Sequence, residues 1–130
     1  MNSAVLAILL RSSLVLHTGS VHFSGGNHNN LNAGAGIAYA VTDSVSVQGG
    51  FFRNSVFNWS EYISGEYRPI HFGGFSAGAF GGAVNHYRLN NGRAIPVAGL
   101  VAQYKNFRVR YVPGFKDSGN VATLELVFPL

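Results

Sequence analysis

The sequence predicts an all-β fold, a single antiparallel eight-stranded up-and-down β-barrel. Apolar and polar residues alternate with a period of two along most of the chain, and clusters of Gly, Asn and Asp interrupt the alternation. Most of the alternating segments are about ten residues long, the length of a tilted strand that crosses a bilayer. Only 11% of the residues are charged, far below the roughly 25% of an ordinary soluble domain.

Length and composition restrict the class of protein further. A chain of 130 residues is the size of one domain, and its 47% hydrophobic content excludes a disordered protein. The absence of cysteine excludes disulfides, a thiol nucleophile and cysteine-based metal sites. The sequence therefore describes one ordered domain without cysteine chemistry.

The first part of the chain differs from the rest. Residues 4–10 form a continuous apolar stretch, which Arg11 interrupts before residues 14–16 resume it. This stretch is too short for a spanning helix, which needs roughly 20 apolar residues. We expect residues 1–16 to be a signal-like segment or an N-terminal tether, and residues 17–130 to form the barrel domain.

Each of the eight expected strands has one apolar face. In the second, Ala33, Ile37 and Tyr39 share one face while Asn32, Gly34 and Gly36 share the other. The expected strands are residues 14–24, 32–41, 44–53, 57–67, 70–83, 94–104, 106–113 and 120–128.

The connections between these segments alternate in length. Short ones occur at Thr42-Asp43, Arg68-Pro69 and Lys105-Asn106. The others are mostly longer and rich in Asn and Gly, namely residues 25–31, 54–56, 85–93 and 114–119. Short turns at one end and longer loops at the other are typical of outer-membrane barrels.

The two faces of the strands predict which side meets lipid. An eight-stranded barrel has too narrow a lumen for Phe107, Val109 and Tyr111 together. The opposite orientation places four polar side chains inside, where they can pair, and the apolar face against lipid; these are Gln48, Arg108, Arg110 and Glu125. A soluble barrel, such as a subunit of a virus particle, is the alternative, because periodicity does not reveal which face meets water.

Two patterns that suggest ligands have simpler explanations. The glycine-rich run 73–82 is followed by neither Lys-Ser/Thr nor a helix, so it is not a phosphate loop. Alternating small residues instead suit the inside of a narrow barrel, where they leave a slot for a ligand chain or allow the strands to coil. The basic residues are scattered over strand ends and loops, so we expect no nucleic-acid partner.

The histidines do not predict a metal site. His17 and His22 are five residues apart, so a regular strand places them on opposite faces. His28, His71 and His86 are distant in sequence from this pair and from one another. We expect neither a metal nor any other cofactor.

Several segments, in order, resemble one known family, the outer-membrane lipid A palmitoyltransferases, over about residues 17–130. They are Ser20-Val21-His22-Phe23, residues 28–36 (HNNLNAGAG), Phe52-Arg53-Asn54-Ser55, Glu66-Tyr67-Arg68-Pro69, Ile95-Pro96-Val97-Ala98, and Tyr111-Val112-Pro113-Gly114 followed by Gly119-Asn120-Val121. The resemblance implies an eight-stranded barrel that moves an acyl chain from a phospholipid to lipid A. Its implied partners are phospholipid and lipopolysaccharide, and its implied location is the outer membrane. We expect a monomer if the barrel is embedded in a membrane.

Carried over residue by residue, the resemblance implies a catalytic site. His22 would be the general base and Ser55 the catalytic hydroxyl, with Asn54 where the family has an acidic residue. Pro96 and Pro113 would interrupt ladder hydrogen bonds and form a lateral lipid gate.

The sequence departs from the family in several ways that concern activity, including a shorter loop after Ser55. Asn54 can orient an imidazole but cannot stabilise its positive charge as a carboxylate would, and Asp117-Ser118 offers a rival site. The family's amphipathic helix before the barrel is also missing from the pattern. The alternative function is a non-catalytic lipid-binding or structural barrel, either in a membrane or in a soluble assembly such as a virion.

Overall fold

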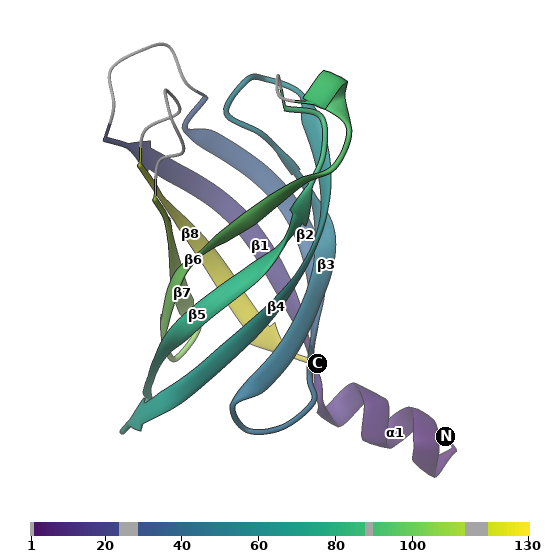
Figure 1. Ribbon diagram of the computed structural model, residues 1–130. Helices are drawn as coiled ribbons and strands as arrows, with labels where there is room; N and C mark the ends of the chain where they lie inside the picture. Colours follow the sequence, from purple (N-terminus) through teal and green to yellow (C-terminus); the bar gives the residue numbers. More distant parts are fainter. Residues whose placement is uncertain (1, 24–28, 88–89, 114–119) are drawn as a thin grey trace.

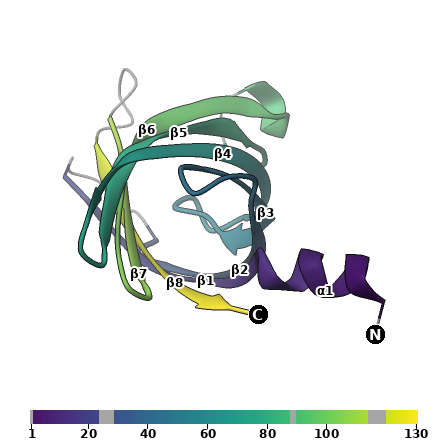
Figure 2. The same ribbon diagram turned by 90° about the horizontal axis from the view of Figure 1, so that it is seen from below.

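Eight strands form one closed barrel in the computed structural model, which describes residues 2–23, 29–87, 90–113 and 120–130. Each strand pairs antiparallel with the next, and the last pairs with the first (Figures 1 and 2). The predicted all-β up-and-down barrel is therefore confirmed. The strands are β1 (Ser12–His22), β2 (Leu31–Ala40), β3 (Val45–Arg53), β4 (Trp59–Phe72), β5 (Phe75–Val84), β6 (Ile95–Tyr104), β7 (Phe107–Val112) and β8 (Val121–Pro129).

The two ends of the barrel differ in their connections. The turns after β2, β4 and β6 lie at the end where both chain termini are found, which we call the turn end (Figure 1). The longer connections lie at the opposite end, the loop end, together with the short 3₁₀ helix η1 (Asn90–Gly92). The alternation of short and long connections read from the sequence is present.

One short turn lies elsewhere than predicted. β4 continues through Arg68-Pro69 to Phe72, and the chain reverses at Gly73-Gly74, where Gly73 has a φ of 59°. The β4–β5 register shifts between Tyr67 and Ile70. This irregularity accommodates Pro69, which has no N–H to donate to a ladder. Pro69, which the sequence predicts to lie in a turn, thus interrupts the pairing within a long strand.

The barrel also begins earlier than predicted. β1 starts at Ser12, two residues before the expected first strand, and it takes residues 12–16 of the expected N-terminal segment into the pairing with β2 and β8. The helix α1 (Ser3–Leu10) precedes β1 and projects away from the barrel (Figures 1 and 2). It is apolar on all sides and buries no residue, so it is not an amphipathic helix. In the described part of the chain, no helix is long and apolar enough to cross a bilayer.

A register shift in β1 changes the predicted position of one histidine. His17 is opposite Glu125 of β8, and His22 is opposite Val121, with the shift between His17 and Gly19. Glu125 and Val121 are four residues apart on a regular strand and share a face. Both histidines therefore face the lumen, and the prediction that they lie on opposite faces was wrong because the irregularity moves one residue out of the alternation.

The barrel has its apolar face outside and its polar face inside. Ile63 is 67% exposed and Leu100 is 61% exposed on the outer wall. Buried polar side chains line the lumen, including the four predicted from the alternation: Gln48, Arg108, Arg110 and Glu125. The buried apolar cluster is small, and it lies near the turn end: Val15, Ala38 and Val127.

Inward-facing glycines allow neighbouring strands to approach closely. A Cβ atom on Gly82 of β5 would collide with the carbonyl oxygen of Ile63 and lie 2.7 Å from Ser64 Cα on β4. The adjacent Gly81 has no such restriction, since its nearest neighbour would be the Val97 carbonyl oxygen at 3.9 Å. Of the two explanations for the glycine-rich run, the structure favours the coiling of strands.

Gly82→Ala should therefore destabilise the barrel by about 1–3 kcal/mol, because the β4 and β5 backbones must separate to accept the methyl group. Gly81→Ala, one residue away on the outer face, should be neutral or stabilise by up to about 1 kcal/mol. Urea unfolding of both variants in the same detergent measures the difference. Equal effects of the two substitutions would contradict the close approach.

Candidate functional site

Charged side chains cross the lumen and meet at its centre. Arg110 Nη2 on β7 lies 2.6 Å from Glu66 Oε1 on β4, and Arg108 Nη1 lies 3.4 Å from the same oxygen. Arg108 Nη1 also lies 3.3 Å from Glu125 Oε2 on β8 and donates a hydrogen bond to Gln48 Oε1 on β3. We call Gln48, Glu66, Arg108, Arg110 and Glu125 the lumen cluster.

The lumen cluster fills the barrel at its level. β3 and β7 are four strands apart in a ring of eight, so they are on opposite walls. Arg108 is 2% exposed, and the other four members are buried as well. Eight strands enclose a lumen that side chains can fill, and here charged and amide groups do so.

The lumen holds more positive than negative charge among these residues. Arg68 adds a third guanidinium, with its Nε 3.6 Å from Glu66 Oε2 and its Nη1 donating to Gln103 Oε1 at 2.5 Å and to Ser76 Oγ at 3.0 Å. Three arginines therefore share two carboxylates. Burial of these charges is tolerated because each carboxylate contacts several guanidinium groups.

His17 is joined to the lumen cluster, although the sequence did not indicate it as a site residue. Its Nε2 is 2.7 Å from the Tyr62 hydroxyl, which also accepts a hydrogen bond from Gln48 Nε2 at 2.6 Å. His17 Nδ1 lies 3.6 Å from Glu125 Oε1. The imidazole and Tyr62 pack edge to face, with ring centroids 5.1 Å apart, and Phe52 lies against both rings. Alternation alone placed His17 on a strand, but its partners come from distant strands.

Asn54 has a structural role in the β3–β4 connection. It is fully buried, and its Nδ2 donates to Ser60 Oγ at 2.8 Å and to the His86 carbonyl at 3.0 Å. Its Oδ1 accepts hydrogen bonds from the backbone N–H groups of Val56 and Asn58 at 3.0 and 2.9 Å. Both ends of the amide are engaged in holding the loop, as expected for an Asx-type turn.

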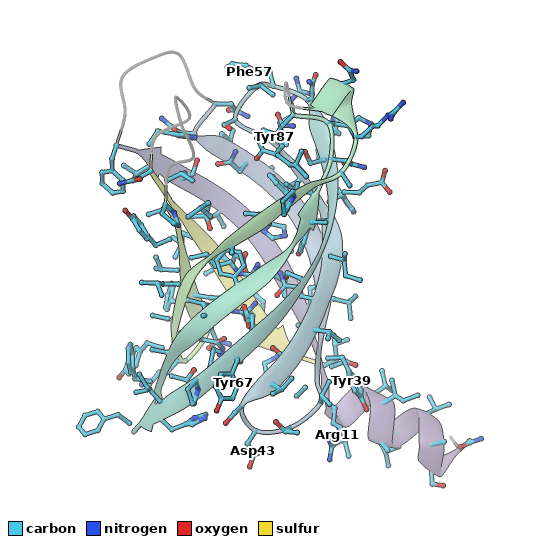
Figure 3. All side chains as sticks on the ribbon, in the orientation of Figure 1. Arg11, Tyr39, Asp43, Phe57, Tyr67 and Tyr87 are labelled. Atoms are coloured by element: carbon cyan, nitrogen blue, oxygen red, sulfur yellow. The ribbon has the colours of Figure 1, made fainter. Side chains whose placement is uncertain are left out.

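Ser55 follows on the same turn and contacts two other loops. Its carbonyl accepts a hydrogen bond from Asn29 N–H at 2.9 Å. The Tyr87 hydroxyl is hydrogen-bonded to Ser55, and burial raises the pKa of this phenol above its usual value. Tyr87 lies at the loop end in Figure 3. The Ser55 turn is therefore tied to the β1–β2 and β5–β6 connections.

His22 lies on the lumen side of β1 at the same end of the barrel. Its Nδ1 is 2.7 Å from Asn30 Oδ1. Asn29 and Asn30 thus connect the Ser55 turn with His22, while Asn54 and Ser55 share one turn. The rival pair Asp117-Ser118, and His28 of the resemblance, fall outside the described residues. Among described residues, no group of three His, Asp or Glu side chains is placed to hold a metal ion.

The two prolines of the expected gate lie on the same side of the barrel. Pro96 is exposed on β6 opposite Ala83 of β5, and Pro113 is exposed just after β7. The β6–β7 ladder extends only from Leu100–Tyr111 to Tyr104–Phe107. Within the described chain, residues 95–99 of β6 therefore have a strand partner on the β5 side alone.

Comparisons with known proteins agree on the fold. No protein-family model and no curated protein matches the sequence. A de novo designed transmembrane β-barrel superposes with a TM-score of 0.66 at 14% identity, covering 92% of this chain and 96% of that one. The N-terminal β-barrel domain of Pseudomonas aeruginosa OprF superposes with a TM-score of 0.55 at 18% identity, covering 91% and 96%. The chain shares the closed β-barrel fold of these two structures.

Glu66→Gln should destabilise the barrel by about 3–5 kcal/mol, because it leaves the buried Arg108 and Arg110 and the partly buried Arg68 with one carboxylate. Glu61→Gln is the matched control, since Glu61 is on the outer face of the same strand and should change stability by no more than about 0.5 kcal/mol. Denaturant unfolding in one detergent compares the two. Similar stabilities would show that the lumen cluster does not hold the barrel together.

Proposed function

We propose that this chain spans a lipid bilayer as a closed, non-conducting barrel of the outer-membrane type, with a lipid-binding or structural role. The observation that carries this proposal is the inverted distribution of polarity, with large apolar side chains outside and buried charges inside. In water this arrangement would expose the apolar face and bury ions at a cost, whereas in a bilayer both faces are satisfied. Phospholipid and lipopolysaccharide are its expected neighbours in an outer membrane.

Aromatic side chains at both ends support the membrane placement. Trp59 and Phe51 are exposed on the outer wall towards the loop end, where β3 ends and β4 begins. Tyr67 is exposed towards the turn end (Figure 3). Phe75 and Tyr104, which pair where β5 begins and β6 ends, are exposed at the same end. Rings of aromatic residues mark the two interfaces of membrane barrels.

In phospholipid vesicles, the folded protein should migrate differently on a gel before and after boiling, and it should carry no ionic current across a planar bilayer. Removing the cross-lumen contacts with Arg108→Ala and Glu66→Ala together should open a measurable conductance in protein that still folds. A protein that stays folded and soluble in buffer without detergent would support the soluble assembly instead. Conductance by the wild type would contradict the closed lumen.

Acyl transfer is a second candidate, and the placement of His22 supports it. This imidazole faces the lumen at the loop end, and Ser55 lies at the same end with its turn linked to Asn30 through Asn29. An acyl-transfer site needs a base and a hydroxyl near one membrane surface. Asn54 would not supply a carboxylate, and its amide is already engaged in the turn.

If this second function holds, detergent-solubilised protein should move a labelled acyl chain from phospholipid to lipid A or to water. His22→Ala and Ser55→Ala should each lower the rate by about a hundredfold or more, because the first removes the general base and the second removes the reacting hydroxyl. His71→Ala and Ser44→Ala are matched controls, since this His–Ser pair lies 3.3 Å apart at the turn end. Product that survives the first two substitutions would contradict the site. If the folded wild-type protein forms no product, acyl transfer is contradicted and the non-catalytic role stands.

A further inference from the structure

A second group of polar side chains lies inside the barrel, between the lumen cluster and the turn end. Arg68 Nη1 on β4 donates hydrogen bonds to Ser76 Oγ on β5 at 3.0 Å and to Gln103 Oε1 on β6 at 2.5 Å. Gln103 Oε1 also accepts a hydrogen bond from Arg108 Nε at 3.1 Å. This group is therefore continuous with the lumen cluster.

Two further side chains complete the group where the lumen ends. His71 is opposite Ser76 in the β4–β5 ladder, and directly opposed residues share a face, so His71 is on the lumen side as well. Its Nε2 lies 3.3 Å from Ser44 Oγ in the β2–β3 connection. The backbone N–H of Arg68 donates to the Ser44 carbonyl at 2.7 Å. We call Ser44, Arg68, His71, Ser76 and Gln103 the mouth cluster.

The mouth cluster can be reached from water, unlike the lumen cluster. His71 is exposed. The side chain of Arg68 is 18% exposed, whereas that of Arg108 is 2% exposed. All three strand connections at this end of the barrel belong to the described part of the chain. A dissolved ligand would therefore meet Arg68 first.

The strands place one more positive than negative charge in the lumen when histidine is neutral. Arg68, Arg108 and Arg110 share the carboxylates of Glu66 and Glu125. The three remaining acidic residues of the chain belong to the β2–β3 connection, the outer face of β4 and the β7–β8 connection, namely Asp43, Glu61 and Asp117. The lumen strands therefore hold one cation more than they can neutralise.

This excess charge falls on the Arg68 side of the lumen. Glu66 Oε1 lies 2.6 Å from Arg110 Nη2 and 3.4 Å from Arg108 Nη1, whereas the closest approach to Arg68 is 3.6 Å, between Oε2 and Nε. The carboxylate is thus nearer to the two deeper arginines. An uncompensated charge inside a protein is costly, and at Arg68 a counterion from water can reduce that cost.

We propose that the mouth cluster binds a dissolved oxyanion of the phosphate class, which supplies the negative charge that the lumen lacks. The Arg68 guanidinium would hold two of its oxygens, in the geometry with which arginine recognises phosphate. The His71 imidazole and the Ser44 hydroxyl would contact it from the rim. These contacts are inside the barrel, so the inference goes beyond the proposed function and does not require lipid at the outer wall.

The location of the mouth cluster favours a dissolved anion over a lipid headgroup. The short turns of outer-membrane barrels face the aqueous periplasm, and the mouth cluster opens at the end with the short turns. A headgroup at the same level would lie around the outer wall, on the other side of the strands from Arg68. The ligand is therefore expected to come from water.

Phosphate binding should appear as stabilisation of the folded barrel. Wild type and Arg68→Gln are unfolded in urea with increasing inorganic phosphate, in a neutral, lipid-free detergent at an ionic strength held constant with sodium chloride. Phosphate also stabilises proteins by exclusion from their surface, an effect that both proteins share, so the difference between them reports the site. At ten times its dissociation constant, phosphate should lower the unfolding equilibrium constant of wild type about elevenfold more than that of Arg68→Gln.

Three further variants test the assignment. Lys105→Gln removes a cation of the same end, whose Nζ lies over the exposed Tyr104 ring, and it should respond to phosphate as wild type does. Asp43→Asn removes the carboxylate next to Ser44, so it should bind phosphate as tightly as wild type or more tightly. Arg68→Lys keeps the charge but loses the planar fork, so it should bind phosphate more weakly.

The comparison requires that the variants fold. Arg68→Gln leaves two arginines with two glutamates in the lumen, so it should fold, and its migration on a gel before and after boiling checks this. If it does not fold, Arg68→Lys takes its place in the comparison.

Three results would overturn the inference, and none of them bears on the membrane placement. Equal responses of wild type and the Arg68 variant would show that phosphate acts only by exclusion. A response lost as fully in Lys105→Gln would show general attraction by positive charge instead of a site. A response that appears only after anionic phospholipid is added would show that a headgroup, and not a dissolved oxyanion, is the ligand.

Discussion

The ion pairs that cross the lumen are the interaction on which the rest of the structure depends. With its large apolar side chains outside, the barrel has only a small buried apolar cluster, so the inner wall must be held by polar contacts. Arg108 and Arg110 on β7 reach Glu66 on β4 and Glu125 on β8. A shift of one residue in any of these strands would turn its charge to the apolar outer face. The cluster therefore specifies register as well as filling the lumen.

Local irregularities make this arrangement compatible with closure. The shift between His17 and Gly19 keeps both ends of β1 in register with β8, and it brings His17 to Tyr62 while leaving His22 on the lumen side. The break around Pro69 has a similar effect in β4. Close approaches at inward glycines such as Gly82 permit the strong curvature of a small barrel. Each device relieves strain that eight regular strands would accumulate.

The loop end combines two kinds of chemistry on the two sides of the wall. Inside, the asparagine-rich connections bind one another, with Asn54 bonded at both ends of its amide and Ser55 tied to Tyr87. This bonding explains why an amide suits position 54, because Asn54 Nδ2 donates to the Ser60 hydroxyl and to the His86 carbonyl. Outside, Arg53 and Glu61 form no ion pair with another described residue, and the Arg53 guanidinium lies over the Trp59 ring.

The sequence by itself determined the class of fold, the eight segments and the orientation of the faces. Alternation is a local property of each strand. The few charged residues on the alternating strands, such as Arg108 and Glu125, can be stable only in the lumen. It also indicated that Asn54-Ser55 form a connection. Only the tertiary structure decided which strands share a charge, where β4 reverses, that His22 faces the lumen and that His17 joins Tyr62. Those features depend on register shifts, and a shift is set by the partner strand and by closure of the ring, neither of which is encoded in a local pattern.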